Sequence, residues 1–140
     1  MTRRLIGFGA PDRGDDIAGW SVADAVTSWP TEQFSSGSFE LVSSWDDTDD
    51  VVIVDAMRSG AEPGTIRRFD AIAKPLPIGT FRSSHAFGPA AIVELARSLG
   101  QLPRTLRVYG IEIGTVEHGA AVSPDVTAAI DVVVRELDDA

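Results

Sequence analysis

Three residues far apart in the sequence, Asp16, Asp55 and His85, could together hold a divalent metal ion. Two carboxylates and one imidazole form a mixed oxygen and nitrogen donor set, which suits a borderline divalent metal and leaves coordination positions open. The chain has no Cys, so disulfides, thiolate nucleophiles and Cys-ligated metals are excluded. Any metal would therefore bind carboxylates and the two histidines, His85 and His118.

Each of these residues also has a purely structural interpretation. Asp15 and Asp16 stand at the start of a predicted helix, where acids cap free N–H groups and complement the helix dipole. Asp55 could cap the following turn through the backbone around residues 58–60. A lone His in a loop, such as His85, is more often a surface residue than a metal ligand. We expect the loop residue His118 to be solvated.

The elements that must position the three residues are strands followed by turns or helices. Residues 3–9 are predicted to form a strand that ends in a glycine turn, and apolar spacing predicts a helix from Asp16 to Trp29. The apolar run 51–54, closed by Asp55, is typical of a central buried strand. Ligand sites of open α/β sheets lie at the carboxyl ends of their strands. Asp16, Asp55 and His85 could therefore converge there.

The rest of the chain continues the alternation of strands and helices. Ser123 and Pro124 predict a helix start, with Ser123 as the N-cap and Pro124 at the first helical position. Gly100 is expected in the left-handed conformation after a helix. We predict a single α/β domain over residues 1–140 with a mostly parallel sheet flanked by helices. Further strands are expected over residues 39–44, 65–72 and 106–113, and helices over 92–99 and 124–137.

One connection does not fit a parallel sheet. Only residues 45–50 separate the predicted strand 39–44 from the strand that begins at Val51. A parallel crossover needs about a dozen residues or more. The two segments are therefore antiparallel neighbours, or the first is not a regular strand.

The glycines near the N-terminus do not form a nucleotide-binding motif. Asp12 stands where the dinucleotide fingerprint requires its third glycine. Gly9 and Gly14 have phosphate-loop spacing, but Asp15 and Asp16 occupy the positions of the Lys and the Ser or Thr. Two carboxylates there would repel a triphosphate.

Composition narrows the class of protein further. The 140 residues include 12 Lys and Arg against 21 Asp and Glu, a net charge of −9. Nucleic acid and anionic membranes select basic surfaces, so neither is expected as a partner. No apolar run reaches the roughly 18 residues that span a bilayer, and the N-terminus lacks a signal-peptide pattern. We therefore expect a cytoplasmic protein.

Six short motifs resemble, in order, those of the endopeptidases that mature nickel–iron hydrogenases. They are Leu5-Ile-Gly-Phe-Gly9 with Arg13-Gly-Asp-Asp16-Ile-Ala-Gly19, Val51-Val-Ile-Val-Asp-Ala56, Glu62-Pro-Gly-Thr65, Ser83-Ser-His85, Gly110-Ile-Glu112 and Val122-Ser-Pro124. The resemblance implies a cytoplasmic protease that removes a short C-terminal peptide from the hydrogenase large-subunit precursor.

The resemblance also implies roles for individual residues. Asp16, Asp55 and His85 match the family's nickel-recognition set, and the nickel is expected to be supplied by the substrate rather than held permanently. A metal bridging these groups could polarise the scissile carbonyl while Asp16 or Asp55 positions or deprotonates water, which makes both candidate catalytic residues. Glu112 matches the family's Gly-Ile-Glu motif, but we assign it no chemical role.

Three features depart from the family pattern. Ala10 replaces the usual Asn, and Asp16 replaces the usual Glu, so its carboxylate reaches one methylene less far. Relatives commonly have a loop and a helix before the Asp55 strand, where only residues 45–50 are expected here. These departures leave an alternative open, a non-catalytic metal-sensing or precursor-binding module that has kept the fold and lost cleavage.

Overall fold

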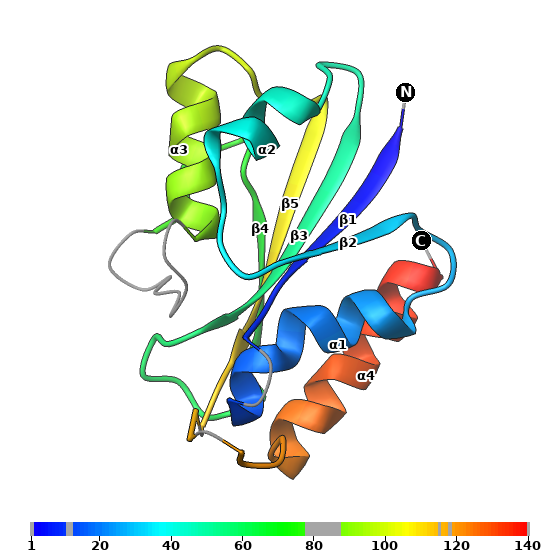
Figure 1. The fold of residues 1–140 in the computed structure, drawn as a ribbon, viewed down its shortest axis with the longest axis vertical. Helices are drawn as coiled ribbons and strands as arrows, with labels where there is room; N and C mark the ends of the chain where they lie inside the picture. Colours follow the sequence, from blue (N-terminus) through cyan, green and yellow to red (C-terminus); the bar gives the residue numbers. More distant parts are fainter. Residues whose placement is uncertain (1, 11–12, 78–87, 115, 118, 140) are drawn as a thin grey trace.

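The computed structural model describes residues 2–10, 13–77, 88–114, 116–117 and 119–139. Strands and helices alternate along the chain (Figure 1). In chain order the elements are β1 (Arg3–Phe8), the 3₁₀ helix η1 (Gly14–Ile17), α1 (Ala18–Ala25), β2 (Thr31–Phe34), α2 (Phe39–Ser44), β3 (Asp50–Met57), β4 (Ile66–Asp70), α3 (Pro89–Ser98), β5 (Thr105–Glu112) and α4 (Pro124–Asp138).

The five strands form one sheet in the order β2-β1-β3-β5-β4. β2, β1, β3 and β5 run parallel to one another, whereas β4 pairs antiparallel with β5. We call the side of the sheet where the parallel strands finish its carboxyl end, and the side where they begin its amino end. The predicted α/β class with a mostly parallel sheet is confirmed.

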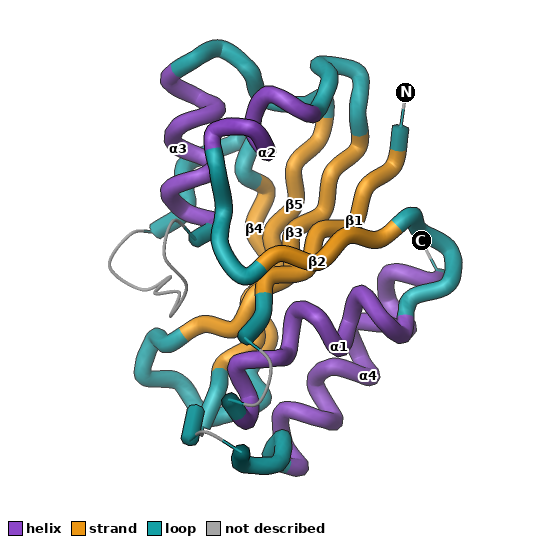
Figure 2. Tube along the Cα trace, viewed as in Figure 1, coloured by secondary structure: helices purple, strands orange, loops and turns teal. Residues whose placement is uncertain are grey.

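Helices cover both faces of this sheet. α1 and α4 pack on one face, and α2 and α3 pack on the other (Figure 2). Alternate residues of β3 enter the two cores: Val52 and Val54 contact the α1 and α4 side, and Val51 and Ile53 contact the α2 and α3 side. A strand buried on both faces requires a continuous apolar run, which confirms the prediction for residues 51–54.

The two C-terminal helices also agree with the sequence predictions. α4 covers its predicted range, and α3 begins three residues before its predicted range and ends one residue short of it, at Ser98. Gly100, two residues beyond α3, has the expected left-handed conformation with a φ of 66°. Pro124 is the first residue of α4. Ser123, however, makes no side-chain capping bond to α4, because its hydroxyl donates to Asp15 instead.

The prediction of a strand over residues 39–44 is wrong. These residues form α2, which begins after Ser38, whose hydroxyl accepts a hydrogen bond from the amide of Leu41 at 3.1 Å. This N-cap stabilises the helix, since it satisfies an amide that has no partner within the first turn. The second strand is β2, which lies earlier, directly after Pro30, and pairs in parallel with β1.

The position of β2 also corrects the expectation of a shortened connection. Residues 35–49 join β2 to β3, and they contain α2. This segment is long enough for a parallel crossover. The departure from the family pattern predicted for residues 45–50 is therefore wrong.

The first predicted helix is shorter than its apolar spacing indicated. The segment begins as η1, continues as α1 and ends before Val26, which has extended backbone angles. Trp29 still packs in the same core, although it lies in the loop after α1, and its indole N–H donates to the carbonyl of Leu137. A loop residue thus contributes to the same apolar surface as α1. Among the described residues, no helix combines the length and apolarity needed to cross a membrane.

Candidate active site

The chain changes direction across the sheet between β1 and β3. From β1 it passes through α1 to β2 on one side, and it then returns to β3 on the other side of β1. In open α/β sheets, ligands bind outside the carboxyl ends of the two strands at such a switch point. In this chain Asp55 lies near the carboxyl end of β3, and Asp16 lies in η1, which follows the carboxyl end of β1.

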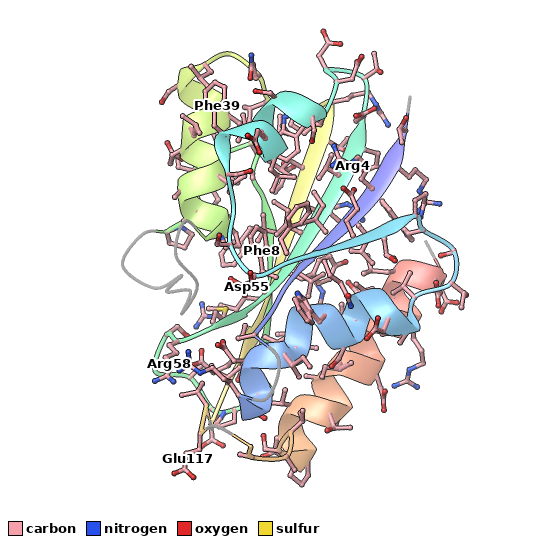
Figure 3. The ribbon with its side chains drawn as sticks, viewed as in Figure 1. Arg4, Phe8, Phe39, Asp55, Arg58 and Glu117 are labelled. Atoms are coloured by element: carbon pink, nitrogen blue, oxygen red, sulfur yellow. The ribbon has the colours of Figure 1, made fainter. Side chains whose placement is uncertain are left out.

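Asp55 lies two residues before the end of β3 and is fully buried. Its side chain is on the same face of β3 as Ile53 and Met57, which is the face that α2 and α3 cover. β5 places Gly110 opposite Asp55, and Phe8 of β1 lies near it on the other side (Figure 3). A carboxylate enclosed in this way is in an environment of low dielectric, where its charge interacts strongly with any nearby cation.

Asp16 lies in η1 and is also fully buried. Its carbonyl oxygen accepts a hydrogen bond from the amide of Ala10 at 3.0 Å, and its own amide donates to the carbonyl of Arg13 at 3.2 Å. Gly14, at the start of η1, has a φ of 57°, a left-handed conformation that favours glycine. These backbone contacts of residues 10, 13 and 14 hold Asp16 in a tightly folded segment.

Two glycines bring the segments of Asp16 and Asp55 together. A Cβ on Gly19 would overlap the carbonyl oxygens of Phe8 and Val54, the residue before Asp55. A Cβ on Gly7 would overlap the carbonyl of Gly19. The backbone that follows Asp16 therefore packs directly on β1 and β3. Gly7 of β1 and Gly19 of α1 thus allow α1 to pack closely on β1 and β3.

Asp15 has a structural role, but not the predicted one of capping α1. The amide of Gly114 donates to its Oδ2 at 2.8 Å, and the amide of Ser123 donates to its Oδ1 at 2.7 Å. The Ser123 hydroxyl lies 2.8 Å from Oδ2 and 3.0 Å from Oδ1. The fully buried Asp15 carboxylate thus joins η1 to the loop after β5 and to the start of α4.

The turn after β3, expected as a partner of Asp55, is held by Glu112 instead. The amide of Ser59 lies 3.0 Å from both carboxylate oxygens of Glu112, and the Ser59 hydroxyl donates to Oε1 at 2.6 Å. Glu112 is the buried last residue of β5. The sequence contained a signal for this role. Glu112 ends a strand rich in apolar residues, and an acid that is buried there needs hydrogen-bond donors.

The two histidines, His85 and His118, lie outside the described residues. Within residues 2–10, 13–77, 88–114, 116–117 and 119–139, no three His, Cys, Asp or Glu side chains gather in a group that could hold a metal ion. The set predicted from the sequence included His85, so these residues contain only its two carboxylates, Asp16 and Asp55.

Several solved hydrogenase maturation proteases are similar to this chain in fold. The chain is similar to the [NiFe] hydrogenase maturation protease HybD from Thermococcus kodakarensis, with 21% identity, a TM-score of 0.78, and coverage of 99% of this chain and 98% of that one. It is also similar to the endopeptidase HycI from Escherichia coli (22% identity, TM-score 0.76, 99% and 90% coverage). The hydrogenase maturating endopeptidase HybD from Escherichia coli gives 21% identity, a TM-score of 0.74, and 98% and 90% coverage.

The fold is thus that of a class of small α/β proteases. By sequence, no curated protein matches the chain, but residues 36–139 match the family model described as HycI, hydrogenase maturation protease. The chain belongs to the hydrogenase maturation protease family, and it is accordingly a peptide hydrolase. The matched range includes Asp55 and Glu112.

Proposed function

We propose that the protein removes a C-terminal peptide from a nickel-loaded hydrogenase large-subunit precursor, with Asp16 and Asp55 as the catalytic carboxylates. The observation that carries this proposal is the presence of two fully buried acids where β1 and β3 meet at the switch point. Buried acids at such a position are typical of functional sites, because burial opposes their charged form and only a function or a partner compensates for it.

His85 completes the proposed nickel-recognition set. α3 begins at Pro89, four residues after His85, and packs on the face of the sheet to which Asp55 belongs. Carboxylates and imidazole are donors that suit nickel. In this proposal the nickel arrives with the substrate, so recognition of the metal and recognition of the precursor are one event.

The proposed reaction is hydrolysis of one peptide bond. The nickel of the substrate supplies Lewis acidity at the scissile carbonyl. Asp16 or Asp55 accepts a proton from the attacking water, whose oxygen bonds to the carbonyl carbon. The C–N bond then breaks, and the same proton passes to the departing amine. Burial of both acids excludes other water from this step.

Asp16 stands where relatives usually have Glu. Its side chain is one methylene shorter, which moves the carboxylate by roughly 1.5 Å. The shorter reach requires the metal to lie closer to η1 than it would with a Glu. An Asp16→Glu variant therefore tests how closely this site is matched to its substrate.

The test is intact-mass spectrometry of a hydrogenase large-subunit precursor from the same organism, incubated with the protein with and without nickel loading. We expect loss of a single C-terminal peptide in the nickel-loaded sample only. His85→Ala is expected to abolish this nickel-dependent cleavage, and His118→Ala is the matched control that retains it. Unchanged cleavage by His85→Ala contradicts the assignment of His85, whereas a precursor that binds and stays uncut contradicts the proposed reaction.

The same proposal covers the partner and the compartment. The resemblance to the family implies a cytoplasmic protease, and we propose the cytoplasm as the site of action. The acidic net charge of −9 supports a protein partner over nucleic acid or an anionic membrane. Fractionation of cells followed by detection of the protein with its precursor tests this part of the proposal.

A further inference from the structure

We propose that Asp15 and Glu112 are positioning residues that hold the segments carrying Asp16 and Asp55 in the geometry that cleavage requires. This inference rests on the proposed function of those two acids. It assigns separate tasks to the four acids that are buried at the carboxyl end of the sheet among the described residues. These acids are Asp15, Asp16, Asp55 and Glu112.

Asp15 fixes η1 through hydrogen bonds to segments that are distant in the sequence. Its carboxylate binds two amides and one hydroxyl, which belong to the loop after β5 and to the residue before α4. Neighbouring residues of a 3₁₀ helix point about 120° apart around its axis. The side chain of Asp16 is therefore directed away from the anchor, and the direction it takes is set by how firmly Asp15 is held.

Glu112 has the corresponding role for β3, the strand that carries Asp55. Across the sheet it is paired with Met57, the last residue of β3. Its side chain holds the amide and hydroxyl of Ser59, and its backbone pairs with Gly64 and Thr65 on the opposite side. Glu112 therefore lies between the end of β3, two residues beyond Asp55, and the turn that leads into β4, and it binds both.

Each anchor also has a hydroxyl donor that can be removed while a backbone amide still binds the buried carboxylate. Ser123→Ala and Ser59→Ala each remove a hydroxyl and keep the backbone amide that binds the same carboxylate. These two variants weaken the anchors while leaving the acids in place. They are expected to fold, and they supply the mild members of a graded series.

The amino end of the sheet offers a matched control. Asp49 is buried, and it accepts hydrogen bonds from the amides of Thr2 at 3.1 Å and Asp46 at 2.9 Å. Like Asp15, it is an acid that ties separate backbone segments together. Unlike Asp15, it lies at the end of β3 opposite to Asp55. Asp49→Asn therefore removes a similar structural contribution without touching the proposed site.

The experiment compares kcat, KM and the thermal midpoint for Asp15→Asn, Glu112→Gln, Ser123→Ala, Ser59→Ala and Asp49→Asn, at a temperature where all are folded. We expect Asp15→Asn to lower kcat by about 100-fold with KM unchanged, because a displacement of about 1 Å has an effect of this size. Glu112→Gln acts on the end of β3, two residues beyond Asp55, whereas Asp15 is adjacent to Asp16, so a smaller decrease of about tenfold is expected. The two serine variants, which keep the backbone amides, should lower kcat less than either acid variant. Asp49→Asn should lower the midpoint and leave kcat unchanged.

Two results overturn the inference. One is a wild-type kcat for folded Asp15→Asn, and the other is an equal loss of kcat for Asp49→Asn at a similar loss of stability. Failure of the proposed function has a different signature, since Asp16→Asn and Asp55→Asn would then cleave as well as wild type.

Hydrogen exchange supplies a readout that does not depend on cleavage. We expect Asp15→Asn to speed amide exchange in residues 13–19, which include Asp16, while exchange in β1 and β3 stays slow. Unchanged exchange in residues 13–19 would overturn the positioning role of Asp15, whether or not a precursor is cut.

Discussion

The two ends of the sheet differ in how many acidic residues they enclose. At the carboxyl end four of the described acids are buried, and two of them, Asp15 and Glu112, are held by backbone amides and hydroxyls. At the amino end Asp49 is buried, whereas Asp50 lies 3.8 Å from the guanidinium of a β5 arginine and Asp138 caps an exposed turn. Enclosed negative charge is thus concentrated at the carboxyl end.

We expect this difference to separate substitutions that affect stability from substitutions that affect cleavage. An enclosed carboxylate opposes folding unless hydrogen bonds compensate for its lost solvation, and several enclosed acids at one end of a sheet are typical of a functional site. Exposed ion pairs contribute little to stability, about 0–1 kcal/mol each, and they demand no such purpose. We conclude that substitutions at the carboxyl end should reduce cleavage, and those at the amino end should reduce only stability.

The largest expected effect is on catalysis at the carboxyl end. Asp55→Asn removes the charge of the proposed base and is expected to lower kcat by about 10²–10⁴-fold, as is Asp16→Asn. Asp16→Glu is the control that restores the residue usual in relatives, and it should retain cleavage. Kinetics of precursor cleavage measure the effect, and a variant that loses Asp55 yet cleaves normally would break the comparison.

Gly19→Ala should damage stability and cleavage together. The added methyl would overlap the carbonyls of Phe8 and Val54, and overpacking of this kind destabilises by about 1–3 kcal/mol or more. Relief of the overlap moves η1 away from β3 and so moves Asp16 away from Asp55. Urea unfolding and cleavage kinetics measure the two losses.

At the amino end, Trp29→Phe should lower stability without lowering kcat. The Trp29 indole N–H donates to the buried carbonyl of Leu137 at 3.1 Å, and the Arg3 guanidinium lies 3.8 Å from the ring centre. Loss of the hydrogen bond leaves a buried acceptor unsatisfied, so we expect a decrease of about 1–2 kcal/mol in the free energy of unfolding. A large decrease in kcat for the folded variant would show that the two ends are coupled.

The smallest effect concerns the pH dependence of stability. The hydroxyl and amide of Ser28, with the amide of Thr27, hold the pKa of Asp138 below its ordinary value of 3.8. A carboxyl whose pKa is lower in the folded state stabilises the protein above its unfolded pKa, and this contribution is lost as the pH falls through the folded value. Asp138→Asn should therefore be less stable than wild type at pH 7, by an amount that shrinks below about pH 4.

Urea unfolding of wild type and Asp138→Asn at several pH values between 3 and 7 measures this difference. Asp139→Asn is the neighbouring control, since it removes one negative charge from the same end of α4 without removing the bonds to residues 27 and 28. A constant difference between wild type and Asp138→Asn across the whole range contradicts the assignment.

Local pattern was sufficient where one segment carried its own signal. The apolar run 51–54 identified the central strand, and Pro124 together with the apolar spacing after it identified α4. The pattern was insufficient for residues 31–44. There the four-residue strand β2 is too short to show alternation, and Leu41 and Val42 of α2 are adjacent apolar residues that fit a strand equally well. Ser38 is a residue type that is favoured at helix N-caps. It caps a helix only where the folded chain places a free backbone amide near its hydroxyl.

The sequence by itself determined the fold class and the residue types able to do chemistry, because hydrophobic periodicity and the acids that end strands are local properties. Only the tertiary structure decided which hydrogen bonds each acid forms. Asp15 and Asp16 are adjacent and chemically identical, yet Asp15 is bound to Gly114 and Ser123, residues about a hundred positions away. Sequence position cannot separate the two, since a hydrogen bond depends on which groups the folded chain brings within about 3 Å.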